Sequence, residues 1–325
     1  MKIDVCICTH NPRLEILTIV LNAIANQTIG KDQYQVWIID NGSSPPISTT
    51  DISPLSIAGI AHQLIREPRL GIMYARELAG QTATGDVVMF VDDDNELTLN
   101  YLEVAIDILE SHPEIGFFGG KLLSGIKVAY PTWMNPLFGY IGIKDCGDLP
   151  ISKCLKGDYD WGEWEPPTAG SVVRRQVLQR YFEILKLIPQ DLVIGRQGSQ
   201  GLLSSEDSLI AKCCYELDLE CSYQPRLQLI HHISDQRLQF GYFVRLLFNY
   251  GRSYVLLRKA MGQRVESNIL VSIAKSLKWW FQKGISFEYL ICIFAKESGF
   301  IYEFWRSNPN KIDRNQPSAA NRLNP

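Results

Sequence analysis

Short apolar runs alternate with helix-like segments through the first third of this chain. The last of these runs, DVVMFVD at 86–92, is almost unbroken, which is typical of a strand buried on both faces of a parallel sheet. Strand–helix alternation of this kind predicts an α/β doubly wound sheet. The predicted strands are 3–8, 34–40, 62–67 and 86–92, and the predicted helices begin near Pro12 and span 71–85 and 99–111.

Local signals predict where these elements begin and end. Asn11 followed by Pro12 predicts a capped helix start, and Gly85 predicts a helix end. Segment 43–56 is rich in Ser, Thr and Pro, so it predicts a surface loop. The second half is less regular. It predicts an irregular segment over 125–170, strands at 168–173 and 221–232, and helices at 174–185, 204–217 and through most of 239–305.

Composition excludes some classes of protein. The 325 residues carry a formal net charge of −3 and the pI is near 6.0, so no basic footprint predicts nucleic-acid binding. The eight cysteines show no paired metal-ligand spacing and are interpreted as buried free thiols, which fits a reducing cytoplasm. We expect no signal peptide, and no stretch approaches the ~18 consecutive apolar residues of a membrane-spanning helix.

Polar residues follow each predicted strand. Ligands of doubly wound sheets bind outside the carboxyl ends of the strands, where these residues would meet. In an extended segment Asp92 and Asp94 would share one face and Asp93 would point away. Paired carboxylates suit Mg²⁺ or Mn²⁺, although a solvated acidic loop is the simpler alternative. We therefore expect Asp93→Ala to impair activity much less than Asp94→Ala.

An ordered set of motifs carries a resemblance. CTHNP, WIIDNGS, LGIMYARELAG and FVDDDN are followed by TAGSVVRR, the pair Glu206–Asp207 and LIHHISDQR. Over about residues 3–255 this set resembles the family 2 inverting glycosyltransferases. The resemblance implies a GT-A-type doubly wound mixed sheet with a helical C-terminal extension. The implied units are a catalytic domain at 1–235, with a nucleotide-binding half at 1–120 and an acceptor half at 121–235, a helical region at 236–305 and a disordered tail at 306–325.

The resemblance also implies roles for single residues. Asp40 matches the carboxylate that contacts the donor base, and Arg76 matches the basic residue near the diphosphate. Asp92 matches the ribose-side position of a DxD motif, and Asp94 matches its ligand to Mn²⁺ or Mg²⁺. His231 is the preferred further metal ligand and His232 is the alternative. The complete donor-binding set is Thr9, Asn11, Asp40, Arg66, Arg76, Asp92 and Asp93.

Asp207 has two interpretations. Ser204 and Asp207 have the spacing of a variant capping box, and acids in a first helical turn complement the helix dipole. The resemblance instead implies that Asp207, paired with Glu206, is the catalytic base that takes a proton from the acceptor hydroxyl. The ordered motifs favour the base.

Aromatic residues suggest two further surfaces. One set lies between the aspartates and Glu206, and forms either an acceptor wall or a buried support for the loop. The other lies at 275–283, where aromatic residues and lysines alternate, and forms either a membrane-surface contact or a packed helix. The first set comprises Trp133, Trp161 and Trp164 with Asp158, Asp160, Glu163 and Glu165.

These observations predict a metal-assisted inverting glycosyltransferase. Its donor would be a nucleotide-diphosphate sugar, with UDP preferred, and its acceptor a hydroxyl of a glycan or a lipid-linked oligosaccharide. We expect a cytoplasmic protein, or one held at the inner face of the membrane by its C-terminal helices. A nucleotidyltransferase and a non-catalytic glycan-binding subunit are the alternatives, and the absence of a Gly- and Lys/Arg-rich loop in CTHNPRLE disfavours the first.

Overall fold

The computed structural model describes residues 1–157, 161–188, 195, 202–265, 274 and 286–307. Within these residues nine strands form one sheet in the order β3-β2-β1-β4-β8-β6-β9-β5, with β7 paired to β9. The strands are β1 (Ile3–Thr9), β2 (Tyr34–Asp40), β3 (His62–Arg66), β4 (Val87–Val91), β5 (Asn95–Leu97), β6 (Ile115–Ser124), β7 (Ile151–Lys153), β8 (Ser171–Arg174) and β9 (Glu220–His231).

The sheet is mixed, as predicted. β1 to β4 are parallel, β8 runs antiparallel between β4 and β6, and β9 is parallel to β6. All five residues of β4 are buried, which confirms the two-sided burial indicated by its apolar run. The carboxyl ends of β1, β4, β6 and β9 therefore lie at one edge of the sheet, together with the start of β8.

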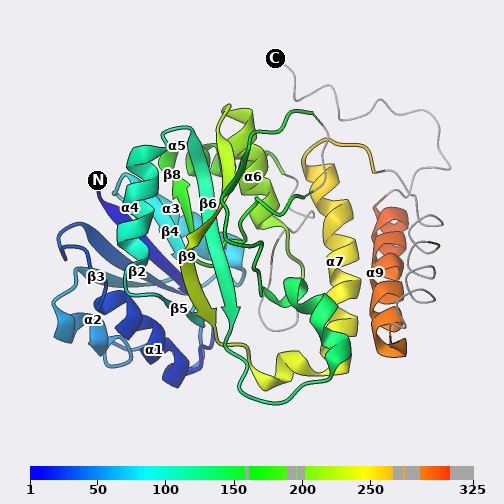
Figure 1. Ribbon diagram of the computed structural model, residues 1–325, viewed down its shortest axis with the longest axis horizontal. Coiled ribbons are helices and arrows are strands. Elements are labelled where there is room, and N and C mark those ends of the chain that lie inside the picture. The colour runs from blue at the N-terminus through cyan, green and yellow to red at the C-terminus, as the bar shows by residue number, and fades with distance from the viewer. Residues whose placement is uncertain (158–160, 189–194, 196–201, 266–273, 275–285, 308–325) are drawn as a thin grey trace.

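Helices cover both faces of this sheet (Figure 1). Side chains of α1, α2 and α4 pack on the face that carries Val5 and Ile7, and side chains of α3, α5 and α6 pack on the face that carries Cys6 and Cys8. Successive side chains of β1 therefore point into two separate cores, one on each face of the sheet. The helices are α1 (Leu14–Ala25), α2 (Ser53–Ala58), α3 (Ile72–Thr82), α4 (Tyr101–Ser111), α5 (Arg175–Leu187) and α6 (Glu206–Glu216).

A third core joins the C-terminal helices to the irregular segment. α7 (Phe240–Ala260) and α9 (Phe287–Arg306) lie side by side, and the 3₁₀ segments η1 (Thr132–Ile141) and η2 (Asp235–Leu238) pack at their side (Figure 1). The buried Glu303 accepts a hydrogen bond from Arg252 Nε at 2.8 Å, which ties α9 to α7. No helix of the described residues is long and apolar enough to cross a membrane.

Several local predictions were wrong. α1 begins at Leu14 with Arg13 at its N-cap, so Asn11 does not cap it. α3 ends at Thr82, and Gly85 instead donates its N–H to the buried Asp4. Segment 43–56 is not all surface loop, because Ile47 and Ile52 are buried and α2 begins at Ser53.

Other expectations had mixed outcomes. Cys6, Cys8, Cys213 and Cys214 are buried free thiols, as predicted. β5, β6 and β7 were not predicted, and they lie in or beside the segments that looked irregular or acidic. The aromatic and lysine-rich segment at 275–283 lies outside the described residues.

Candidate active site

The sheet topology brings two distant polar segments together. β5 follows the three aspartates and pairs antiparallel with β9, and Asn95 lies opposite His231 in that register. The backbone N–H of His232 donates to the carbonyl oxygen of Asp94 at 2.8 Å. The end of β9 is therefore held against the turn that contains Asp94, although the two segments are far apart in the sequence.

The three aspartates form a turn rather than an extended segment, because β4 ends at Val91 and β5 begins at Asn95. The alternation rule therefore does not apply, and the expectation that Asp93 points away is wrong. Asp93 accepts a hydrogen bond from the hydroxyl of Thr9. Burial, followed by the nearby charge of Asp94, raises the pKa of Asp93 to about 7.

Asp94 is the aspartate that faces β9. Its Oδ1 lies 3.4 Å from His231 Nε2, and its Oδ2 lies 3.4 Å from Arg237 Nη1. Burial opposes the charged carboxylate, but the positive charges around it, from His231, Arg237 and Arg13, hold the pKa of Asp94 below its ordinary value. Asp94 is therefore a buried carboxylate that requires a cation beside it.

The two histidines have different surroundings. His231 Nδ1 donates to the carbonyl oxygen of Gly142 at 3.1 Å, which orients the ring so that Nε2 faces Asp94. The protonated ring supports the Asp94 carboxylate, and the ring would bind a cation through Nε2 after losing that proton. His232 Nε2 instead donates to Glu96 Oε2 at 2.7 Å. His231 is thus the histidine that lies beside Asp94.

Asp94 and His231 fit a divalent cation in their chemistry. A carboxylate oxygen and an imidazole nitrogen with a fixed tautomer are ordinary ligands, and diphosphate oxygens can supply the rest. Among the described residues, no group of three or more His, Cys, Asp or Glu side chains is arranged to hold a metal by itself. Asp94 and His231 are therefore two side chains that could serve as ligands, with the other ligands coming from a bound substrate.

Arg237 is a charged residue of this site that the sequence interpretation did not assign. It lies in η2, and its Nη1 is 3.4 Å from both Asp94 Oδ2 and His231 Nε2. Its guanidinium therefore lies beside the two atoms that a cation would bind. The only signal in the sequence was its position six residues after His231.

The predicted donor-binding residues differ in burial and in their hydrogen bonds. The carboxylate of Asp40 is buried and accepts the backbone N–H groups of Ser43 and Ile47, at 2.9 and 3.3 Å. Asn11 is exposed and accepts the N–H of Ser44 through its Oδ1 at 2.8 Å. Arg66 is exposed at the end of β3, opposite Asp40 in the strand register. In this structure Asp40 and Asn11 shape the loop after β2.

Arg76 connects two helices rather than pointing into open space. Its guanidinium is buried, and it donates to Glu206 Oε1 at 2.7 Å and to the hydroxyl of Thr168 at 2.6 Å. Burial disfavours the charge, but the negative charges of Glu206 and Asp92 raise the pKa of Arg76 above its ordinary value. Arg76 thus fixes the start of α6 against α3, close to the aspartate turn.

Asp207 follows Glu206 in the first turn of α6. Ser205 is the N-cap residue and its side chain makes no capping hydrogen bond, the Ser204 hydroxyl has no partner among the described residues, and Asp207 Oδ1 accepts the backbone N–H of Ser208 at 2.9 Å. The capping box from Ser204 was therefore wrong. Burial, followed by the charge of Glu206, raises the pKa of Asp207 to about 6. Arg76 forms its ion pair with Glu206, so the carboxylate of Asp207 is not paired with that guanidinium.

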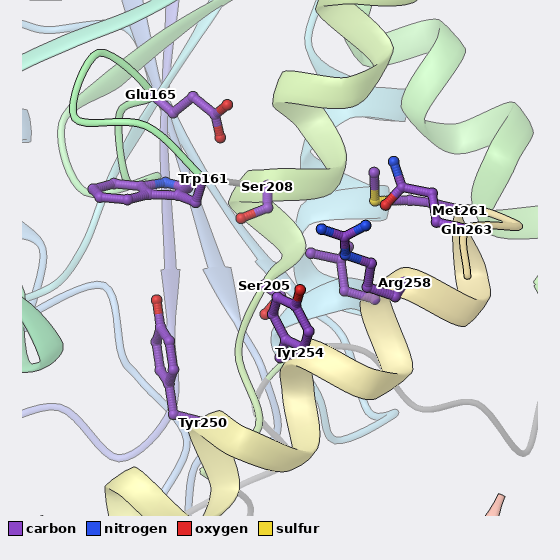
Figure 2. Close-up of a pocket in the computed structure, with 10 residues that line it drawn as sticks. Trp161, Glu165, Ser205, Ser208, Tyr250, Tyr254, Arg258, Met261 and Gln263 are labelled. Carbon is purple, nitrogen blue, oxygen red and sulfur yellow. The ribbon is translucent and has the colours of Figure 1, made fainter. Parts of the chain in front are cut away.

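A pocket of about 100 Å³ lies beside the start of α6 (Figure 2). Ser205 and Ser208 line it on either side of Asp207 in the sequence, and Trp161 and Glu165 line it from the loop that precedes β8. The charge of Asp207 contributes to the raised pKa values of Glu165 and of Tyr250, so Asp207 lies within electrostatic reach of this pocket. The other lining residues are Tyr250, Tyr254, Leu257, Arg258, Met261 and Gln263.

Only one tryptophan of the predicted acceptor wall lines the pocket. Trp133 packs edge-on against Phe240 and Phe243, and Trp164 donates its Nε1–H to the hydroxyl of Tyr215 at 2.8 Å. These two rings stabilise the loop and the third core. Trp161 is 49% exposed and lines the pocket. Glu163 is exposed, and Asp158 and Asp160 lie outside the described residues.

Comparison with known proteins identifies the family. Residues 4–182, more than half of the chain, match the family model described as Glycosyl transferase family 2. The chain therefore belongs to glycosyltransferase family 2 and is a glycosyltransferase. A curated relative, the glucosyl-dolichyl phosphate glucuronosyltransferase of Haloferax volcanii, is 21% identical over 97% of this chain and 99% of its own length.

Solved structures show the fold. The mannosyltransferase PcManGT from Pyrobaculum calidifontis, solved with GDP-Man and Mn²⁺, matches with a TM-score of 0.56 and 12% identity over 94% of this chain and 87% of its own. S. aureus TarS matches with a TM-score of 0.47 and 15% identity over 94% of this chain, but only 54% of the TarS chain. The family and the likeness to the mannosyltransferase confirm the predicted GT-A fold.

Proposed function

We propose that this protein transfers a sugar, with inversion, from a nucleotide-diphosphate donor to a hydroxyl of a saccharide acceptor. The observation that carries the proposal is Asp207. It is a partly buried carboxylate at a helix start, its pKa is raised to about 6, and its charge acts on Glu165 and Tyr250, which line the pocket. A carboxylate with a pKa close to neutral is suited to remove a proton from a hydroxyl at physiological pH.

The donor would lie at the edge formed by the ends of β1, β4 and β9. Asp94 and His231 would hold a divalent cation there, and a bound Mn²⁺ or Mg²⁺ supplies Lewis-acid stabilisation of the departing diphosphate. The mannosyltransferase neighbour was solved with GDP-Man and Mn²⁺, which supports a nucleotide sugar and a metal. We retain UDP as the preferred nucleotide, as the sequence resemblance implies.

Asp207 would act on the acceptor. Its carboxylate would accept the proton of the attacking hydroxyl while that oxygen forms the bond to the anomeric carbon, and the nucleoside diphosphate departs with the bonding electrons. Arg76 would not touch the substrate, but it would hold Glu206, and thereby the start of α6, in register with the aspartate turn. The name of the Haloferax relative supports a lipid-linked saccharide as acceptor.

The donor half of the proposal is tested by thermal unfolding with UDP, GDP and their sugar conjugates, with and without Mn²⁺. A ligand at about 100 times its Kd stabilises a protein by about 2.7 kcal/mol. We expect one nucleotide to stabilise the protein, and to do so only when Mn²⁺ is present. Asp94→Asn should abolish this metal-dependent stabilisation. Stabilisation by neither nucleotide would overturn the proposal.

The Asp207→Asn variant tests the base. We expect this variant to bind the nucleotide as the wild type does and to lose transfer by about 10²- to 10⁴-fold. Transfer by Asp207→Asn at the rate of the wild type would remove Asp207 from the mechanism without affecting the donor site.

A further inference from the structure

Glu165 has a feature that the proposed reaction does not use. Its side chain is 1% exposed, and its Oε1 accepts the hydroxyl proton of Tyr215 at 3.0 Å. Its Oε2 is buried and has no hydrogen-bond partner among the described residues. Buried polar atoms are almost always hydrogen-bonded, so an unpartnered carboxyl oxygen at the wall of a pocket can bond a polar group that enters the pocket.

The carboxyl of Glu165 is suited to a neutral partner. Burial raises the pKa of Glu165 to about 8, and the charge of Asp207 acts in the same direction. A protonated carboxyl can donate one hydrogen bond and accept another. A hydroxyl group can take both roles, whereas a second carboxylate could only accept.

Trp161 adds an apolar surface to the same pocket. Its indole is half exposed, and it comes from the same loop as Glu165 (Figure 2). Lys144 fixes this loop, because its Nζ donates to the backbone oxygen of Glu165 at 2.7 Å and lies 4.9 Å from the centre of the Trp161 ring. An aromatic ring beside a hydroxyl-binding group is a suitable combination for one face of a sugar.

The size of the pocket limits what it can hold. A volume of about 100 Å³ leaves room for several water molecules, and therefore for one edge of a sugar ring with its hydroxyl groups. The remaining polar groups of the wall are the side chains of Ser205 and Ser208 on α6 and of Tyr250 and Tyr254 on α7.

We propose that this pocket is the subsite for the terminal hexopyranose of the acceptor, with Trp161 packing on the ring and Glu165 hydrogen-bonding a ring hydroxyl. The inference rests on the proposed function, because it places the acceptor hydroxyl next to Asp207. Glu165 is a positioning residue here, because it binds a different hydroxyl group of the sugar from the one that Asp207 deprotonates. It fixes which hydroxyl of the sugar faces Asp207.

The test is the binding of phenyl hexopyranosides in the gluco, galacto and manno configurations. The full chain is saturated with UDP or GDP and Mn²⁺, and binding is measured by saturation-transfer NMR. We expect at least one pyranoside to bind the wild type. Its affinity should fall about tenfold in Glu165→Leu, the effect of one lost hydrogen bond, and by a similar factor in Trp161→Ala. Glu165→Gln should retain binding, because a neutral amide also donates and accepts.

Glu163→Gln is the matched control, because Glu163 is exposed in the same loop. It should bind the pyranoside as the wild type does. No binding of any pyranoside to the wild type, or equal binding to the wild type, Glu165→Leu and Trp161→Ala, would overturn the subsite. Nucleotide-dependent thermal stabilisation of the same samples separates the two proposals, since it tests the donor site alone and should be unchanged in all four variants.

Discussion

At the scale of single residues, acidic side chains that are adjacent in the sequence make different contacts. Glu206 forms a buried ion pair with Arg76, whereas Asp207, one residue later, does not share that contact. Among the three aspartates, Asp93 accepts a hydrogen bond from Thr9, and Asp94 lies beside His231 and Arg237. Identical side chains thus acquire separate roles from what surrounds each of them.

The pKa of Asp207 predicts a pH profile. Only the ionised carboxylate can accept a proton, so kcat/KM should rise as the pH rises through about 6 and then level off. Glu206→Gln removes the neighbouring negative charge that raises this pKa, so its acid limb should lie at lower pH than that of the wild type. Initial rates across the acid and neutral range measure both. An acid limb that stays unchanged in Glu206→Gln would contradict the assignment of this limb to Asp207.

Several charged or titratable groups act electrostatically on Asp207 or are affected by its charge. Arg76 lowers the pKa of Asp207 and Glu206 raises it. Asp207 in turn affects the pKa values of Lys144, Glu165, Tyr181 and Tyr250. Glu165→Gln removes the buried acid that lines the pocket. If the acid limb belongs to Asp207, this variant should still show an acid limb.

Arg237 predicts a competition with metal. Arg237→Met removes a partly exposed guanidinium from beside the buried Asp94, so the metal-free protein should lose about 1–3 kcal/mol of unfolding free energy. Mn²⁺ should then restore more stability to this variant than to the wild type, because Asp94 lacks its other cation. Denaturant unfolding with and without Mn²⁺ measures this. Arg245→Met, at an exposed position of α7, is the control. Equal Mn²⁺ effects in wild type and Arg237→Met would contradict the competition.

At the scale of elements, helix contacts decide where site residues lie. α3 and α6 are joined by Arg76 and Glu206, and α6 is joined to α7 because Ser253 Oγ accepts the backbone N–H of Ser204 at 2.9 Å. α7 then brings Tyr250 and Tyr254 to the pocket. The pocket is therefore assembled from a loop and two helices that are far apart in the sequence.

The contact between α7 and α9 depends on two glycines. A Cβ at Gly299 would meet the backbone of Phe248, and one at Gly251 would meet the backbone of Lys296. Gly299→Ala should therefore destabilise the protein by about 1–3 kcal/mol through overpacking. Gly241→Ala, where a Cβ meets nothing within 4 Å, should change stability little or increase it. Denaturant unfolding of both variants tests the prediction, and equal stabilities would contradict it.

At the scale of the whole molecule, the ends of β4 and β9 bring Asp94 and His231 together at one edge of the sheet, and α6 and α7 form the pocket together with the loop before β8. The C-terminal helices are part of this arrangement, since four residues of α7 line the pocket: Tyr250, Tyr254, Leu257 and Arg258. The nucleotide and Mn²⁺ test addresses the first part, and the pyranoside test addresses the second. The proposed site needs both the sheet edge that carries Asp94 and His231 and the pocket formed by α6 and α7.

The amino-acid sequence by itself determined the parallel half of the sheet and the family. Apolar runs and helical periodicity depend on neighbours in the chain, so β1 to β4 were predicted within about one residue. The ordered motifs also predicted Asp94 and His231, and the structure places these two side chains 3.4 Å apart.

Only the tertiary structure decided which acids face which partners. The turn that directs Asp93 towards Thr9, the pairing of Arg76 with Glu206, and the position of Arg237 all depend on contacts between residues far apart in the chain. The same holds for Trp161, which lines a pocket while Trp133 and Trp164 support the core. Local patterns report which residues can be buried or charged, but packing determines what each of them touches.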